Sequence, residues 1–480
     1  FLMGNESSSE QNDEPTRPTV SSDPASGRPA EAVFDATPID ESGRTPSFLA
    51  ALRGDLQQLE TLRNANADLE APDLFGATPV SAAASQGHVS ALRLLVKAGC
   101  NTNTPNRAGT SPAYAASEQG LIGALEVLSE GGADLAASNS KSGWAPAHIG
   151  AYEGHWDVLE FLNGKKVDLE AKNKNGSTPA FLAAQQGHVD CLTVLQRLGM
   201  NLETPNANGA TPAFIAAQNG HEKVLALFQT FESSYAGLIG SGLMYSRKID
   251  LEVPNKHGAT PAFIAAQNNR IEVLRVLAQA NVDLSLPNNE GSSPALVACM
   301  NGHDKALSIL AAAEADLAKA NKDGATPAYA ACEFGHLTCV KILKEFGASL
   351  EVPTLDGSTP ALVAAKRGHV PVLEFLQEVG VNLGIPNVDG KTSALLAAAK
   401  GHVEVLELLY DFKYKLDVPD AAGNTALKEA ATYGHLDAVR FLLSVGVDGS
   451  AVAAGAAAID AGQPHTAKEL KRYTCCGPSF

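Results

Sequence analysis

Short apolar segments alternate with polar turns along most of the chain, always in the same order. In residues 178–188, Thr-Pro opens a segment of small and apolar residues that closes with Gly-His. Val189, Leu192 and Leu195 then recur on one face of a second helix. The polar stretch 201–209 places Pro and Asn before a Gly, which indicates a turn. The pattern predicts a unit of helix, turn, helix and turn.

This unit recurs at a nearly constant interval. Of the eleven intervals between equivalent positions, nine are of 33 residues, one is of 34 and one is of 49, which is 33 plus 16. The equivalent positions are Pro46, Pro79, Pro112, Pro146, Pro179, Pro212, Pro261, Pro294, Pro327, Pro360, Ser393 and Ala426. One helical hairpin cannot bury its own apolar face, so such units are stable only when they stack. We therefore predict an all-α solenoid of about twelve helix-turn-helix repeats.

The residues at the two ends of each first segment predict a helix of about nine residues. Thr can cap the helix by accepting a backbone N–H of its first turn, and Pro at the next position loses no helical hydrogen bond. The closing Gly supplies a left-handed residue that ends the helix. Nine histidines follow such a position and are expected to bond backbone groups at the turn: His88, His155, His188, His221, His303, His336, His369, His402 and His435.

The unit resembles the ankyrin repeat, whose pattern is Thr-Pro-Leu-His-x-Ala-Ala followed by Gly-His and a Gly-containing β-turn finger. The resemblance covers residues 37–447, with an insertion at about 232–247. It implies an ankyrin-repeat solenoid with β-turn fingers, in which partner proteins bind the concave face made by the first helices and the fingers. Ala usually replaces the Leu of the pattern here, and the His of Thr-Pro-Leu-His survives only as His148.

At the position of that His, six repeats carry an aromatic side chain. Because the neighbouring residue is Ala and not the family's larger Leu, each ring has space to pack inside the stack. We expect core filling by these rings and not ligand binding: Phe48, Tyr114, Phe181, Phe214, Phe263 and Tyr329. Cys299 and Cys332 stand 33 residues apart at a position usually held by Ala, and are expected to be buried.

Three parts of the chain depart from the repeat pattern. Residues 1–36 are rich in Ser, Glu, Pro and Asp with few large apolar residues, so we expect them to be disordered. Residues 448–480 are interpreted as a C-terminal partial repeat or capping tail. Next to the insertion, Asn269 and Arg270 stand where other repeats have Gly-His, and the junction between repeats six and seven is expected to be the least stable.

Composition narrows the classes of partner and of chemistry. The net charge of −17, from 53 acidic and 36 basic residues, disfavours nucleic acid. Seven cysteines, an odd number without metal-site spacing, favour a reducing, cytoplasmic compartment. No apolar run approaches the ~18 residues of a membrane span. No nucleophile elbow, phosphate-binding loop, zinc signature or paired carboxylate motif is present, so we expect no enzyme activity, cofactor or metal.

The C-terminal part of the expected concave face is basic, although the chain is acidic overall. Five positions carry this charge, and two aromatic residues flank them as candidate anchors: Lys366, Arg367, Lys391, Lys400, Lys428, Phe334 and Tyr433. These residues suggest binding of an acidic segment of a partner protein. Alternatively, they are a solvated basic face that the fingertip acids Asp356 and Asp389 neutralise.

Short patterns at both ends suggest weak lipid anchoring. If translation starts at Met3, then Gly4 and Ser8 fit the myristoylation pattern, and Cys475 and Cys476 beside basic residues are candidates for palmitoylation. Peripheral membrane association is therefore an alternative to a cytoplasmic protein, and plain flexible ends are the simpler interpretation.

Together these features predict a non-catalytic scaffold or adaptor that binds partner proteins on a rigid curved surface. Preordered repeats lower the ordering cost of association. The alternative is a structural or linker subunit built stoichiometrically into a larger multiprotein assembly.

Overall fold

The computed structural model describes residues 40–231, 248–447 and 451–476, with side chains as far as residue 474. The predicted disordered segment 1–36 and the insertion at about 232–247 lie outside the described residues. Within them there are 26 helices and no strand. In chain order these are α1 (Pro46–Arg53), α2 (Leu56–Asn64), α3 (Pro79–Gln86), α4 (Val89–Lys97), α5 (Pro112–Glu118), α6 (Ile122–Glu130), α7 (Pro146–Glu153), α8 (Trp156–Gly164), α9 (Pro179–Gln186), α10 (Val189–Arg197), α11 (Pro212–Asn219), α12 (Glu222–Thr230), α13 (Pro261–Gln267), α14 (Ile271–Gln279), α15 (Pro294–Met300), α16 (Asp304–Ala312), α17 (Pro327–Glu333), α18 (Leu337–Glu345), α19 (Pro360–Arg367), α20 (Val370–Glu378), α21 (Ser393–Lys400), α22 (Val403–Asp411), α23 (Ala426–Tyr433), α24 (Leu436–Ser444), α25 (Ala451–Asp460) and α26 (Pro464–Cys476).

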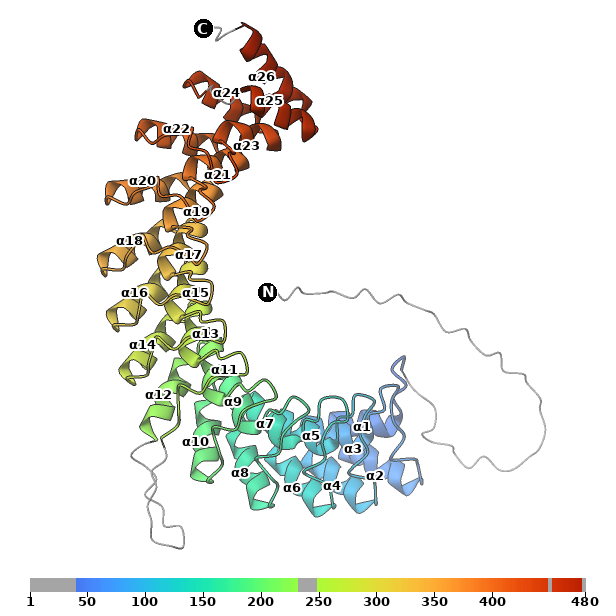
Figure 1. Cartoon of the computed structure of the whole chain (residues 1–480). Helices are drawn as coiled ribbons and strands as arrows, with labels where there is room; N and C mark the ends of the chain where they lie inside the picture. The colour runs from blue at the N-terminus through green and yellow to red at the C-terminus, as the bar shows by residue number, and fades with distance from the viewer. Residues whose placement is uncertain (1–39, 232–247, 448–450, 477–480) are drawn as a thin grey trace, which may run out of the picture.

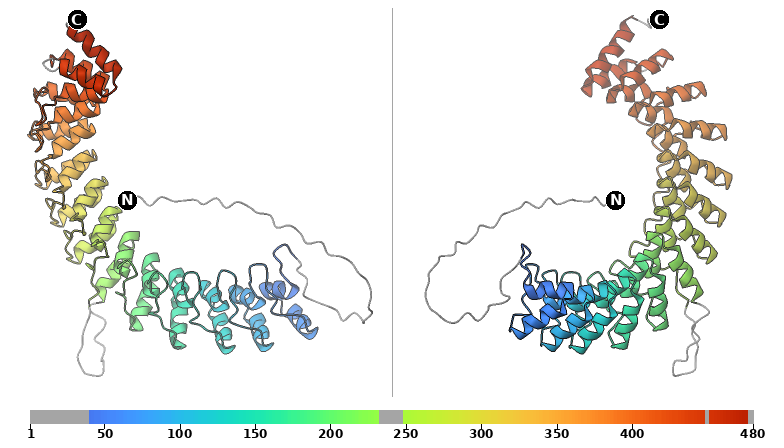
Figure 2. Two further views of the ribbon diagram at one scale, coloured as in Figure 1. Left: turned by 45° about the vertical axis from the view of Figure 1, so that its right-hand side comes forward. Right: turned by 180° about the vertical axis from the view of Figure 1, so that it is seen from behind.

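The helix pairs stack in series into a long curved arc (Figure 1). Odd-numbered helices from α1 to α23 line its inner side, and even-numbered helices from α2 to α24 form its outer side. The view from behind shows the same arrangement (Figure 2). Contacts run from each helix to its partner in the hairpin and to the equivalent helix of the next repeat. The predicted all-α solenoid of about twelve repeats is confirmed.

The inner helices begin where the sequence predicts. In eleven of the twelve, the side chain of the Thr or Ser before the helix accepts a backbone N–H of the first turn. For Thr359, this N–H is that of Leu362, at 3.2 Å. The inner helices have seven or eight residues, not about nine. They are shorter because the left-handed Gly, or the residue before it, has already left helical geometry, as at Gly368 and Gln119.

The aromatic series fills the core only in part. Phe48, Phe181, Phe214 and Phe263 are buried, as predicted, and so are Cys299 and Cys332. The two tyrosines of the series, Tyr114 and Tyr329, are half-buried. Their hydroxyl groups favour contact with water, so the rings stay at the inner surface of the arc.

The nine histidines after glycine connect consecutive repeats. Each Nε2 hydrogen-bonds a backbone carbonyl near the end of the inner helix of the preceding repeat, at 2.8–3.2 Å. The predicted bonding to backbone groups is therefore confirmed, and its partners belong to the neighbouring repeat. In repeat seven, Arg270 Nε takes this role and donates to the carbonyl of Gln218 at 3.0 Å.

The finger turns of consecutive repeats are also joined by hydrogen bonds, here between backbone groups. The backbone N–H of Leu355 donates to the carbonyl of Asp323 in the preceding finger at 3.0 Å, and most neighbouring fingers repeat this bond. A few residues before the finger turns, the Glu203 carboxylate accepts the backbone N–H of Asp250 at 2.9 Å, across the insertion. Bonds of both kinds therefore keep repeats six and seven in the common register.

At the C-terminal end, α25 and α26 pack against each other, α25 packs against α23, and α26 contacts α24. Gln463, at the turn between them, lies against Gly434, where other repeats place the histidine ring. We propose that this pair is the partial repeat or cap expected in residues 448–480, because it covers the exposed end of the last repeat.

Candidate functional site

Two neighbouring cavities lie on the inner side of the arc, over the repeats that contain α15 to α23. Each has a volume of about 480 Å³, within the range of about 300–1,000 Å³ typical of ligand pockets. Both are bounded by inner helices on one side and by finger turns on the other. They occupy the part of the concave face where the sequence placed the candidate partner site.

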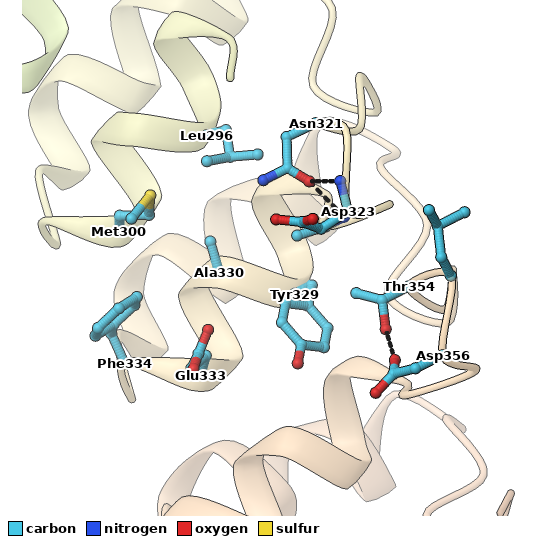
Figure 3. A pocket seen from close by; sticks show the side chains of 12 residues that line it. Leu296, Met300, Asn321, Asp323, Tyr329, Ala330, Glu333, Phe334, Thr354 and Asp356 are labelled. Carbon is cyan, nitrogen blue, oxygen red and sulfur yellow. Dashed lines mark hydrogen bonds between the residues drawn. The ribbon is translucent and has the colours of Figure 1, made fainter. Parts of the chain in front are cut away.

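The first cavity lies between α15, α17 and two fingers (Figure 3). Leu296, Ala330 and Ala325 contribute apolar atoms from the helices and the loop before α17. The remaining lining residues are Met300, Asn321, Asp323, Tyr329, Glu333, Phe334, Thr354, Leu355 and Asp356. Only Phe334 of these was a predicted site residue.

Carboxylates set the electrostatics of the first cavity. Hydrogen bonds from Thr354 and Ser358 lower the pKa of Asp356, so it is ionised. Glu333 forms an ion pair with Arg367, at 2.6 Å. Burial, with the charges of Glu333 and Asp356, raises the pKa of Tyr329 to about 12. The cavity is therefore a site of negative potential.

Large apolar side chains at the edges of this cavity are exposed. The exposed fractions are 39% for Met300 and 45% for Phe334 on the helix side, and 79% for Leu355 on the finger side. The Phe334 ring stacks on His336, with centroids 6.4 Å apart. Exposed apolar side chains gathered around a cavity are typical of protein-binding sites.

The second cavity contains three of the five predicted basic residues. Lys366, Lys400 and Tyr433 line it, together with Lys391. Three carboxylates are also in its lining, those of Asp389, Asp420 and Glu429, and Lys391 Nζ lies 3.7 Å from Asp389. Lys428 lies half-buried on α23 and is not among the lining residues. The positive charges of the three lysines that line the second cavity are therefore balanced by the three acidic residues of its lining.

Sequence reasoning missed Asp323, Tyr329 and Leu355. One signal was present in the sequence. When the fingers are aligned at the 33-residue period, Leu355 and Val388 are apolar, whereas the equivalent residues of the two preceding fingers, Asn289 and Lys322, are polar. Tyr329 was expected in the core, and its hydroxyl group is the one local signal that distinguishes it from the buried phenylalanines.

Metal ligands, membrane-spanning helices and lipid-attachment residues are the other candidate features of the chain. The described ranges contain no group of three or more metal-ligating side chains placed to hold an ion. No helix among them is both long and apolar enough to cross a membrane. Of the lipidation candidates, Gly4 lies outside the described residues, and the side chains of Cys475 and Cys476 are not described.

The comparisons agree with the architecture. The family model for ankyrin repeats (three copies) matches residues 47–139, 147–234, 238–321, 308–387 and 363–452. A search of curated proteins finds no match to the chain. The repeat assignment therefore depends on the family model and on the geometry of the stacked hairpins.

Proposed function

Because the chain belongs to the ankyrin-repeat family, we propose that it is a non-catalytic scaffold or adaptor that binds partner proteins on its concave surface. Ankyrin repeats generally mediate protein–protein interaction. The observation that carries the proposal is the group of exposed apolar side chains around the two inner cavities, which includes Phe334, Leu355 and Tyr433. A partner that covers them removes apolar surface from water.

In the proposed complex, the second cavity holds an acidic segment of the partner. Lys366 and Lys400 supply the positive charge, with Phe334 and Tyr433 as aromatic contacts on either side. Arg367 is engaged by Glu333, and Lys428 lies outside the cavity, so both contribute less than the two lysines. The bound segment must compete with Asp389, Asp420 and Glu429 for these lysines, so we expect affinity to fall steeply with salt.

A matched pair of double variants tests the proposal. Lys366→Glu with Phe334→Ala changes one charge and one aromatic ring on the inner side, and Lys344→Glu with Phe346→Ala makes the same changes on outer helix α18 and at its end. Partners captured from native extract would be identified by mass spectrometry, purified, and titrated against each form by calorimetry. We expect the inner variant to lose binding and the outer variant to retain it. Binding lost only in the outer variant would contradict the proposal.

The same titrations address the alternative of a structural subunit. A partner that copurifies in fixed ratio through high salt, and does not exchange with added free partner, would favour permanent assembly. Reversible binding that weakens with salt would favour an adaptor.

A further inference from the structure

We propose that the first cavity binds a lysine or arginine side chain of a partner segment, together with an apolar residue next to it. This inference rests on the proposed function and names the chemistry of the partner at one site of the same concave surface. The charge of the cavity, its hydrogen-bonding groups and the apolar side chains at its edges support it.

The charge of the lining selects a cationic occupant. Asp323, Glu333 and Asp356 line the cavity, and its lining contains no lysine or arginine. Arg367 pairs with Glu333 from outside the lining, so this arginine neutralises neither Asp323 nor Asp356. Asp323 forms no ion pair within the part of the chain that the structure describes, and it is exposed. A carboxylate of a partner would be repelled here, whereas an ammonium or guanidinium group would be attracted.

The polar groups of the cavity are suited to accept hydrogen bonds. In Figure 3, Tyr329 lies between Glu333 on its own helix and Asp356 on the following finger. Ionised carboxylates only accept, and a phenol oxygen can accept as well. Lysine and arginine side chains only donate, with three and five N–H groups respectively. The lining therefore offers what these two side chains require.

The edges of the cavity favour an apolar neighbour in the bound segment. Met300 and Phe334 lie on one side and the fingertip Leu355 on the other, and all three are exposed. The aliphatic stem of a lysine or arginine can pack along such side chains while its charged head reaches the carboxylates. An aromatic ring at the rim adds a cation–π contact. A second apolar residue of the segment would then cover Leu355.

A free divalent cation is a poorer occupant. The three carboxylates belong to two fingers and a helix, and they do not form a group placed to ligate one ion in the described residues. Asp356 already accepts hydrogen bonds from Thr354 and Ser358. An extended cationic side chain can reach separate carboxylates, which a single metal ion cannot.

Selection from a library tests the proposal without a known partner. Random nonapeptides displayed on phage would be selected on the immobilised full chain, in parallel with Asp323→Lys and with the matched control Glu290→Lys. Glu290 occupies the same position in the preceding finger and is outside the cavity lining. We expect peptides enriched in lysine or arginine next to an apolar residue from the wild type and the control, and loss of this enrichment with Asp323→Lys.

The selected peptide would then be labelled with fluorescein and titrated by anisotropy. Asp323→Lys is expected to weaken its binding about tenfold or more, and Leu355→Ala to weaken it severalfold. Leu74→Ala, at the equivalent position of the finger before α3, is expected to leave it unchanged. Circular dichroism would confirm that every variant is folded.

Failure of this inference and failure of the proposed function give different results. Selected peptides that are acidic or uncharged, or whose binding is indifferent to Asp323→Lys, would overturn the inference. If such peptides still lose binding in the inner variant Lys366→Glu with Phe334→Ala, the concave-surface function stands. If no peptide is selected, the inference is also overturned, and the capture experiment decides the function separately.

Discussion

His369 and Glu333 belong to consecutive repeats and are joined by a hydrogen bond of 3.0 Å between the imidazole Nε2 and the backbone carbonyl oxygen. The carboxylate of the same Glu333 lines the first cavity and pairs with Arg367. The contact that holds two repeats in register therefore also positions an acidic group of the candidate site. Variants at such contacts should affect stability and the site together.

We predict that glycine-to-alanine changes differ in cost according to this contact. Gly335 and Gly347 are both left-handed, with φ of 76° and 80°. A Cβ at Gly335 would lie 2.6 Å from Nδ1 of His369, whereas one at Gly347 would meet nothing within 4 Å. Gly347→Ala should cost about 1 kcal/mol from backbone strain alone, and Gly335→Ala about 2–4 kcal/mol because the ring must shift. Urea unfolding measures both, and equal costs would contradict the prediction.

A missing helix cap offers a stabilising change. Ala145 precedes α7 and has no side-chain oxygen to accept a backbone N–H of the first turn. Its own N–H donates to Nδ1 of His148 at 3.1 Å. Ala145→Thr should restore the cap found at Thr178 and raise the free energy of unfolding by about 1 kcal/mol. Thr178→Ala should lower it by a similar amount. A thermal or urea titration in which Ala145→Thr is no more stable than the wild type would refute the expectation.

Stability should fall on mild acidification because of two histidines. Burial lowers the pKa of His148 and of His402. Between the unfolded-state pKa of about 6.5 and the lower folded-state value, only the unfolded chain takes up these protons. Stability is therefore fully present above about pH 6.5 and is lost as the pH falls through the folded-state pKa. Urea midpoints at pH 7.5 and 5.5 should show this decrease.

The double variant Ala145→Thr with His148→Leu is the control for this effect. It reproduces the Thr359 and Leu362 pair of another repeat and removes one titrating ring. We expect a smaller difference between the two pH values in this variant. Burial raises the pKa of Glu118 and Glu429, whose effect on stability has the opposite sign. An unchanged pH difference would rule out a contribution from His148.

The junction between repeats six and seven is predicted to open most readily. There Asn269 adopts a left-handed φ of 55°, which costs more for Asn than for the Gly of other repeats. Arg270 replaces the histidine contact. Amide hydrogen exchange should be faster in α12 and α13 than in α17 to α20, and Asn269→Gly should slow it. Equal exchange rates in the two regions would show that the junction is as stable as the others.

The helices could be predicted from the sequence because their causes are local. Thr359 caps α19 through a residue three positions away, and Gly368 ends the helix by its own backbone conformation. The 33-residue period then predicts stacking, since each hairpin has an apolar face that only a neighbour can cover. The basic positions Lys366 and Lys400 could be placed on the inner face by the same register.

The sequence by itself thus determined the helices, their order and their stacking, including the histidine contacts to backbone groups. Only the tertiary structure decided which charges meet and where the inner face is hollow. Arg367 and Glu333 are 34 residues apart and pair through space, and each cavity lies between inner helices and fingers of different repeats. Caps and turns act over a few residues, whereas ion pairs and cavities depend on how whole repeats are offset along the arc.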